Sequence, residues 1–266
     1  MAVFELGKHC PHDLTRYVRN DDRLLNLAWI QHLRVGGHEQ ATVGLVGLTS
    51  PVLFGKETVM SLWEKDQMTS LAKLSNKLAI AKSASRSNAH DQRTKTIENS
   101  LTLVSAQRIL QEDAELGDEI ALDERDILRL AVEKIESSQD VDEIKRFAIC
   151  GLSVASAKSP DQLEAIARDA STIWHAVIQA DIDTWQNVAN ENSMAVGGLE
   201  EEELIHFVDG TAFVGVMHDF VTTSGGKMQD VGFGCHRVRN QVMHALGSDE
   251  LEKVLTRSAD VVAAAY

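Results

Sequence analysis

The residues near the amino terminus that could bind a metal are His9, Cys10 and His12. Imidazole and thiolate are common zinc ligands, but a structural zinc site needs four ligands, usually spaced as two pairs. Cys235 and His236 could complete the set only if the two ends of the chain met. The pattern therefore favours ordinary polar residues over a metal site, and we expect no bound metal.

The second candidate for chemistry is the glycine-rich segment 222–234. Gly225-Gly226-Lys227 resembles part of a phosphate-binding loop, but that loop has a longer glycine-rich run before the lysine and a Ser or Thr after it, whereas Met228 follows here. Gly232-Phe-Gly234 likewise lacks the rest of a dinucleotide-binding pattern. Neither a G-x-S-x-G nor an H-E-x-x-H pattern occurs. The sequence therefore predicts neither an enzyme nor a cofactor.

The composition narrows the possible functions further. The chain of 266 residues carries 26 basic and 40 acidic residues, and the resulting net charge of −14 repels phosphate backbones. Its apolar runs are too short for a membrane-spanning helix, and its first residues lack the layout of a signal peptide. The three cysteines have no framework spacing, which fits a reducing compartment. We therefore expect a soluble intracellular protein that binds neither nucleic acid nor membranes directly.

Helical patterns run through almost the whole chain. Only three prolines occur, at Pro11, Pro51 and Pro160, and proline breaks helix interiors. No strand alternation persists, so the sequence predicts an all-α fold, a solenoid-like stack of antiparallel helix pairs in a single domain over residues 1–266. The expected helices cover 14–19, 23–35, 38–48, 56–82 and 91–111, three that begin after Asp123, Asp140 and Pro160, and then 200–221, 235–246 and 248–265.

The longest of these helices carries an apolar stripe. Met68, Leu71, Leu74, Leu78 and Ala81 recur at steps of 3, 3, 4 and 3, which places them on one helix face. A stripe of this kind usually faces a protein core, so by itself it does not predict a binding surface.

Four short motifs in a fixed order resemble a known family. They are Leu27-Ala28-Trp29-Ile30-Gln31-His32, Leu71-Ala72-Lys73-Leu74, Ile173-Trp174-His175 and Asp183-Thr-Trp185. Their order and spacing resemble the C-terminal α-helical region of the nucleoporin 133 family, a scaffold component of the nuclear pore. The resemblance covers about residues 13–266, and its specificity lies in the series of motifs.

The resemblance implies a structural role without catalysis. Family members carry an N-terminal β-propeller that contains their membrane-curvature-sensing segment, and this chain has none, so it is expected to be the C-terminal part of a larger nucleoporin. The family's helical tail binds the tail of nucleoporin 107 in the Y-shaped complex, which implies a place at the nuclear pore in the nucleus and support of mRNA export and protein import. Leu71, Lys73 and Leu74 match the family's partner-binding positions, and Met68 and Leu78 extend that side of the helix.

Some features depart from the family pattern. The polar segment 83–92 and the glycine-rich segment 222–234 match no family motif. Gly151, Gly210 and Gly215 lie in stretches that the resemblance implies are helical, and glycine weakens helix interiors. We expect the later helices to be the least regular.

Two other functions stay open on the sequence alone. Another helical scaffold, such as a vesicle-coat or adaptor subunit, has the same stacked helix pairs and would bind coat proteins instead of pore proteins. An all-α enzyme would have its site around His9, His12, Cys235 or His236, and stoichiometric zinc in a metal analysis would favour it.

Overall fold

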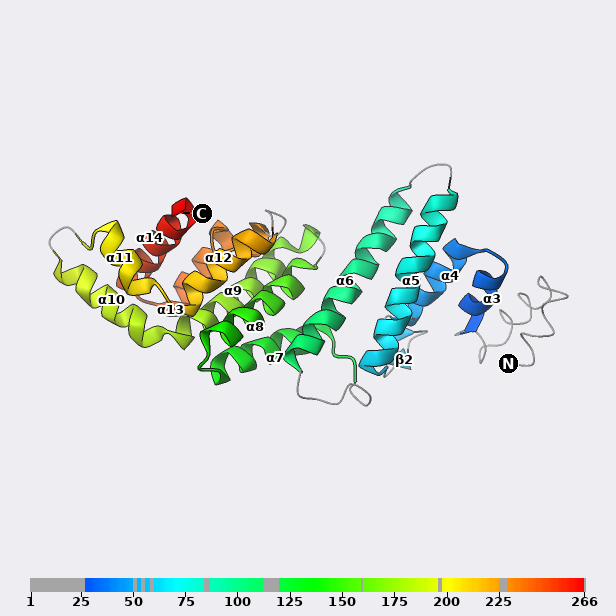
Figure 1. Ribbon diagram of the computed structural model, residues 1–266, viewed down its shortest axis with the longest axis horizontal. Helices are drawn as coiled ribbons and strands as arrows, with labels where there is room; N and C mark the ends of the chain where they lie inside the picture. The colour runs from blue at the N-terminus through cyan, green and yellow to red at the C-terminus, as the bar shows by residue number, and fades with distance from the viewer. Residues whose placement is uncertain are drawn as a thin grey trace. The chain divides into compact units, whose positions relative to one another are not determined.

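The computed structural model describes residues 27–49, 52–53, 56–57, 60–83, 87–111, 120–158, 160–195, 198–224 and 229–265. Within these ranges the protein is all-α, as predicted (Figure 1). The helices are α3 (Ala28–Arg34), α4 (His38–Leu48), α5 (Leu62–Lys82), α6 (Asn88–Leu110), α7 (Glu124–Ser137), α8 (Val141–Ser156), α9 (Leu163–Ala180), α10 (Ile182–Met194), α11 (Glu201–Val208), α12 (Ala212–Ser224), α13 (His236–Leu246) and α14 (Asp249–Ala265), with short 3-10 turns at Pro160–Gln162 and Gln229–Val231.

The contacts between residues group the chain into two compact units. The first unit falls within residues 1–105 and 113–123, and the second within 106–112 and 124–266, so α6 crosses the boundary. The solenoid-like stacking and the single domain over residues 1–266 both stay predictions. Each unit is described by itself below.

The first unit is built around the packing of α4 against α3 and α5. Leu45, Ala72 and Ile97 form its buried centre, so α4, α5 and α6 each contribute one residue. Arg93 Nη2 lies 2.5 Å from Glu39 Oε1, and this hydrogen bond lowers the pKa of the Glu39 carboxyl below its ordinary value. Polar contacts between helices therefore supplement a small apolar core.

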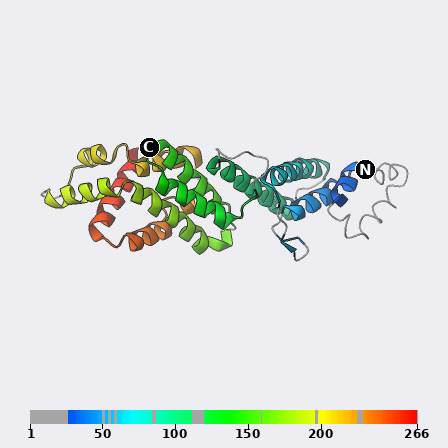
Figure 2. The ribbon, with the colours of Figure 1, turned by 90° about the horizontal axis from the view of Figure 1, so that it is seen from below.

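The start of α5 differs from the prediction. The expected helix 56–82 begins only at Leu62, because Lys56–Glu57 forms strand β2, which pairs antiparallel with β1 (Val52–Leu53), as Figure 2 shows. Ser61 then caps the helix: its Oγ accepts from Glu64 N at 3.2 Å, and Glu64 Oε2 accepts from Ser61 N at 3.0 Å. This reciprocal capping box satisfies backbone groups that would otherwise have no partner, and it fixes where the helix begins.

The second unit has an aromatic centre. The rings of Phe213 and Phe233 both lie 5.6 Å from that of fully buried Trp174 in edge-to-face geometry, and the Trp174 indole Nε1 donates to Val231 O at 2.8 Å. The ring of Trp185 also lies edge-to-face against that of Phe213, with 5.4 Å between the ring centroids. Edge-to-face aromatic pairs stabilise a core beyond the area they bury. The tryptophans of the two later family-like motifs are therefore core residues.

Three helices of the second unit, α7, α8 and α9, pack against one another (Figures 1 and 2). Gly151 of α8 allows their close approach. A Cβ placed on this residue would lie 2.6 Å from Ile173 Cδ1 of α9 and 3.4 Å from Ala131 Cβ of α7. The glycine that weakens the helix by itself therefore permits tight packing between helices.

The sequence predicts one helix over residues 200–221, but the structure has two helices there. α11 ends at Val208 and α12 begins at Ala212, because Gly210 between them adopts a φ of +87°, which only glycine adopts readily. The Asp181 carboxylate accepts from Ala212 N at 2.7 Å and so caps α12 from another helix end. Gly215 follows within α12, and the Lys145 side chain lies over it.

Other element boundaries lie close to the predictions. α4 spans the predicted residues 38–48, and α7 and α8 begin directly after Asp123 and Asp140. The helix predicted over residues 91–111 begins three residues earlier, at Asn88, within the polar segment 83–92. The predicted segment 14–19 lies outside the described residues.

Candidate protein-binding face of α5

Burial divides the five predicted partner-binding residues into two groups. Met68 and Leu71 are half-buried and pack against the cluster of Leu45, Ala72 and Ile97. Leu74 and Leu78 are 61% and 48% exposed, and Lys73 is also exposed. The N-terminal residues of the stripe therefore face the core, and its C-terminal residues face solvent.

The exposed surface of α5 carries three large apolar side chains among its polar ones. Leu74 and Leu78 are one helical turn apart on the same side. Trp63, which is 56% exposed, precedes Leu74 by eleven residues, about three helical turns, and so lies on the same face. The spacing of Trp63 and Leu74 is visible in the sequence, but only the structure shows that Trp63 is exposed whereas its neighbour Leu62 is fully buried. We call Trp63, Leu74 and Leu78 the α5 apolar face.

The charge around the C-terminal half of this face is positive. Residues 70–82 contain three lysines and no acidic residue, in a chain with a net charge of −14. Lys73 and Lys77 are exposed, and neither forms an ion pair with another described residue. Lys82 Nζ lies 2.9 Å from His38 Nε2 of α4. Lys73 and Lys77 therefore place positive charge along one side of Leu74 and Leu78.

Hydrogen bonds fix α5 from both sides and so hold the apolar face on a rigid element. Ser75 Oγ donates to His38 O of α4 at 2.8 Å, and Asn76 Nδ2 donates to Thr94 Oγ1 of α6 at 2.9 Å. Both side chains are buried. A rigid helix loses little conformational entropy when a partner binds, which favours affinity.

A strap from residues 120–123 lies against the beginning of α5. Ala121 N donates to Met60 O at 2.9 Å, and Lys65 Nζ donates to Leu122 O at 3.4 Å. Burial lowers the pKa of Lys65, partly offset by the nearby Asp123 carboxylate. The strap covers a different part of the helix from Leu74 and Leu78, which stay exposed.

The residues considered for metal or phosphate chemistry do not assemble into a site in the part of the chain that the structure describes. His9, Cys10, His12 and Gly225-Gly226-Lys227 lie outside it. Cys235 is half-buried at the start of α13 and His236 is exposed, and the described residues contain no group of three potential metal ligands. None of the described helices combines the length and apolarity that crossing a bilayer requires.

Comparisons with known proteins give no assignment. No protein-family model, no curated protein and no solved structure matches this chain.

Proposed function

We propose that this protein is a helical scaffold subunit that binds a protein partner through the α5 apolar face. The observation that carries the proposal is the pair Leu74 and Leu78, two large apolar side chains exposed one turn apart on a capped and braced helix. Exposed apolar groups in a contiguous patch favour a protein interface. The flanking Lys73 and Lys77 supply the polar rim that such interfaces have.

The resemblance to the nucleoporin 133 family supports a specific partner. We propose that the partner is the tail of nucleoporin 107, in the Y-shaped complex of the nuclear pore, and that the protein acts in the nucleus as a non-catalytic constituent of the pore that supports mRNA export and protein import. Leu74 and Lys73 are family-matched positions and are also exposed. Leu71, the third matched position, packs against the core and supports the helix from below.

Leu71 packs against the core and Leu74 is exposed, and this difference in burial determines which variant tests the proposal. A charge at Leu71 would disturb the core of the first unit, so loss of binding by a Leu71 variant would not distinguish unfolding from loss of contact. Leu74→Glu combined with Leu78→Glu places both new charges on exposed positions. Val43→Glu on α4 is a matched control because Val43 is 56% exposed and lies on another helix of the same unit.

The experiment is a pull-down from nuclear-envelope extract, followed by titration with the purified nucleoporin 107 tail. Circular dichroism and thermal melting verify the folding of each variant. Removing a central anchor typically costs about 2 to 4 kcal/mol, so we expect the affinity of the double variant to fall by roughly 30-fold to 1000-fold. The Val43→Glu variant is expected to bind normally.

Two results would contradict parts of the proposal. Equal binding by the unchanged protein and the folded double variant would remove the α5 apolar face as the site. Recovery of vesicle-coat or adaptor proteins without any pore protein would contradict the assignment to the nuclear pore and favour a coat or adaptor subunit. The α5 apolar face would then still be the proposed binding site.

A further inference from the structure

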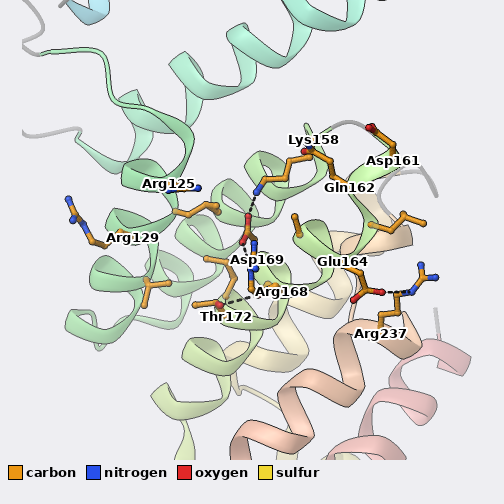
Figure 3. A pocket seen from close by; sticks show the side chains of 15 residues that line it. Arg125, Arg129, Lys158, Asp161, Gln162, Glu164, Arg168, Asp169, Thr172 and Arg237 are labelled. Atoms are coloured by element: carbon orange, nitrogen blue, oxygen red, sulfur yellow. Dashed lines mark hydrogen bonds and ion pairs between the residues drawn. The ribbon is translucent and has the colours of Figure 1, made fainter. Parts of the chain in front are cut away.

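The second unit contains a groove of about 950 Å³ that no part of the proposed function uses. Its walls come from α7, the connection between α8 and α9, the first turns of α9, and the beginning of α13 (Figure 3). Residues as far apart in sequence as Arg125 and Arg237 line it.

The lining is basic although the chain is acidic. Three acidic side chains and five basic ones line the groove, whereas acidic residues outnumber basic ones by 40 to 26 in the whole chain. The basic residues are Arg125, Arg129, Lys158, Arg168 and Arg237. A concentration of one charge sign in a concave surface attracts ligands of the opposite sign.

Two of the three acidic side chains that line the groove, Asp169 and Glu164, lie within 4 Å of a basic side chain. Lys158 Nζ contacts the Asp169 carboxylate and lies 2.7 Å from Glu124 Oε1. Burial by itself would lower the pKa of Lys158, but the hydrogen bonds to Asp169 and Glu124 outweigh it and raise this pKa. Lys158 is therefore a charged structural group that balances one of the two negative charges beside it.

The pairing at the right of the view in Figure 3 is looser. Arg237 Nε lies 3.5 Å from Glu164 Oε1, and both side chains are mostly exposed. Asp161 also has an interaction partner. Each acidic side chain of the lining therefore has an interaction of its own, and basic side chains outnumber acidic ones there by five to three.

Two arginines of the groove keep most of their hydrogen-bonding capacity. Arg125 is exposed and forms no ion pair within the described residues. Arg168 Nε lies 3.8 Å from Asp169 Oδ1, but that carboxylate is already held by Lys158, and the Arg168 side chain is 72% exposed. A guanidinium offers five N–H donors in a planar fork that matches a carboxylate.

Apolar side chains lie between these arginines. Half-buried Leu128 and Val132 of α7 and buried Ile173 of α9 line the same groove. A small anion would not use this apolar surface, and a nucleic acid would be repelled by the net charge of −14. A polypeptide with both aliphatic and acidic side chains uses the apolar surface and the arginines together.

We propose that this groove binds an acidic amphipathic segment of a partner protein, with carboxylates on Arg125 and Arg168 and aliphatic side chains on Leu128 and Val132. The site is separate from the α5 apolar face and does not depend on it. The protein would thus have two interaction surfaces, one in each compact unit.

The test uses the full chain and a fluorescently labelled helical probe peptide in which Leu and Glu repeat at helical spacing. A second peptide carries Gln in place of every Glu. Anisotropy titrations compare the unchanged protein with Arg125→Glu combined with Arg168→Glu. Arg146→Glu is the matched control, because Arg146 is an exposed arginine of α8 that does not line the groove.

Because hydrogen bonds between charged groups are strong, we expect the double variant to lose about tenfold or more in affinity for the Glu peptide. The control variant should bind as the unchanged protein does, the Gln peptide should bind more weakly, and added salt should weaken binding of the Glu peptide. If the double variant fails to fold, Arg125→Gln alone serves, because Arg125 forms no ion pair with a described residue.

Three results would overturn the proposal. They are no binding of the Glu peptide to the unchanged protein, equal binding of the Glu and Gln peptides, and equal binding of the Glu peptide to the folded groove variant. Binding of the nucleoporin 107 tail, measured in parallel, should be unaffected by the groove variant, so failure here is distinguishable from failure of the α5 proposal.

Discussion

Gly151→Ala tests the packing of α8 against α9, the helix that supplies more of the groove lining than any other helix. Alanine in a helix interior is about 1 kcal/mol more favourable than glycine. The added Cβ would lie 2.6 Å from Ile173 Cδ1 and 3.0 Å from its Cγ1, and Ile173 is fully buried, so its side chain cannot move away freely. Overpacking of this kind costs about 1 to 3 kcal/mol. We therefore expect a net loss of stability of about 1 kcal/mol.

A double-mutant cycle assigns that loss to the Ile173 contact. Ile173→Val removes Cδ1, the atom closest to the new Cβ, and by itself costs about 1 kcal/mol. In the Ile173→Val background, Gly151→Ala should be neutral or stabilising, which gives a coupling energy of about 1 kcal/mol or more. Gly47→Ala is the control for helix propensity, because a Cβ there meets no atom within 4 Å.

The assay is urea unfolding followed by circular dichroism for each variant of the cycle. Stabilisation by Gly151→Ala in the otherwise unchanged protein, of the size expected from helix propensity alone, would refute the close approach of α8 and α9. Strict additivity of the two substitutions would refute the assignment of the clash to Ile173.

Two further predictions concern the second unit. Trp174→Phe removes the indole donor to Val231 O and leaves that buried carbonyl without its partner, so urea unfolding should show a loss of about 2 to 3 kcal/mol; a loss below about 0.5 kcal/mol would contradict the hydrogen bond. Burial raises the pKa of Asp181 above its ordinary 3.8, although backbone N–H groups of Ala212 and Phe213 partly oppose this. The folded state then holds the Asp181 proton to higher pH than the unfolded state does, so the free energy of unfolding falls as the pH rises from 3.8 through the raised pKa. Asp181→Asn keeps an oxygen acceptor but does not titrate, so unfolding measured across this pH range should show the unchanged protein losing stability relative to the variant; the opposite slope would contradict the effect of burial.

Local signals in the sequence were sufficient to predict most helices of the fold. Asp123 and Asp140 each precede an amphipathic helix, and α7 and α8 begin at the next residue. The capping oxygen and the helical period are both local properties, so they can be recognised without the tertiary structure.

The wrong predictions concern helix boundaries that the sequence pattern does not mark clearly. The capping box of Ser61 and Glu64 was present in the sequence but lay inside a longer apolar pattern, so α5 was predicted to begin too early. Gly210 was recognised as a weak point, yet only its positive φ shows that the helix ends there. A glycine in a helical pattern can equally permit close packing, as Gly151 does.

The two candidate binding surfaces differ in how far they could be predicted. The stripe on α5 was predicted, but periodicity cannot show that Leu71 faces the core and Leu74 faces solvent, because that depends on where α4 and α6 pack. The groove could not be predicted, because it needs the long-range contact of α13 with α9. No local pattern links Arg125 with Arg237.

The most direct test of the central claim is photo-crosslinking from the α5 apolar face. A photoreactive amino acid replaces Leu74 in the full chain, and in a separate control protein it replaces exposed Val43 of α4. Both proteins are irradiated in nuclear-envelope extract, and the crosslinked products are identified by mass spectrometry. The account predicts a crosslink to the tail of nucleoporin 107 from position 74 and none from position 43. Absence of a crosslink from position 74, in a sample where nucleoporin 107 is present, would contradict the account.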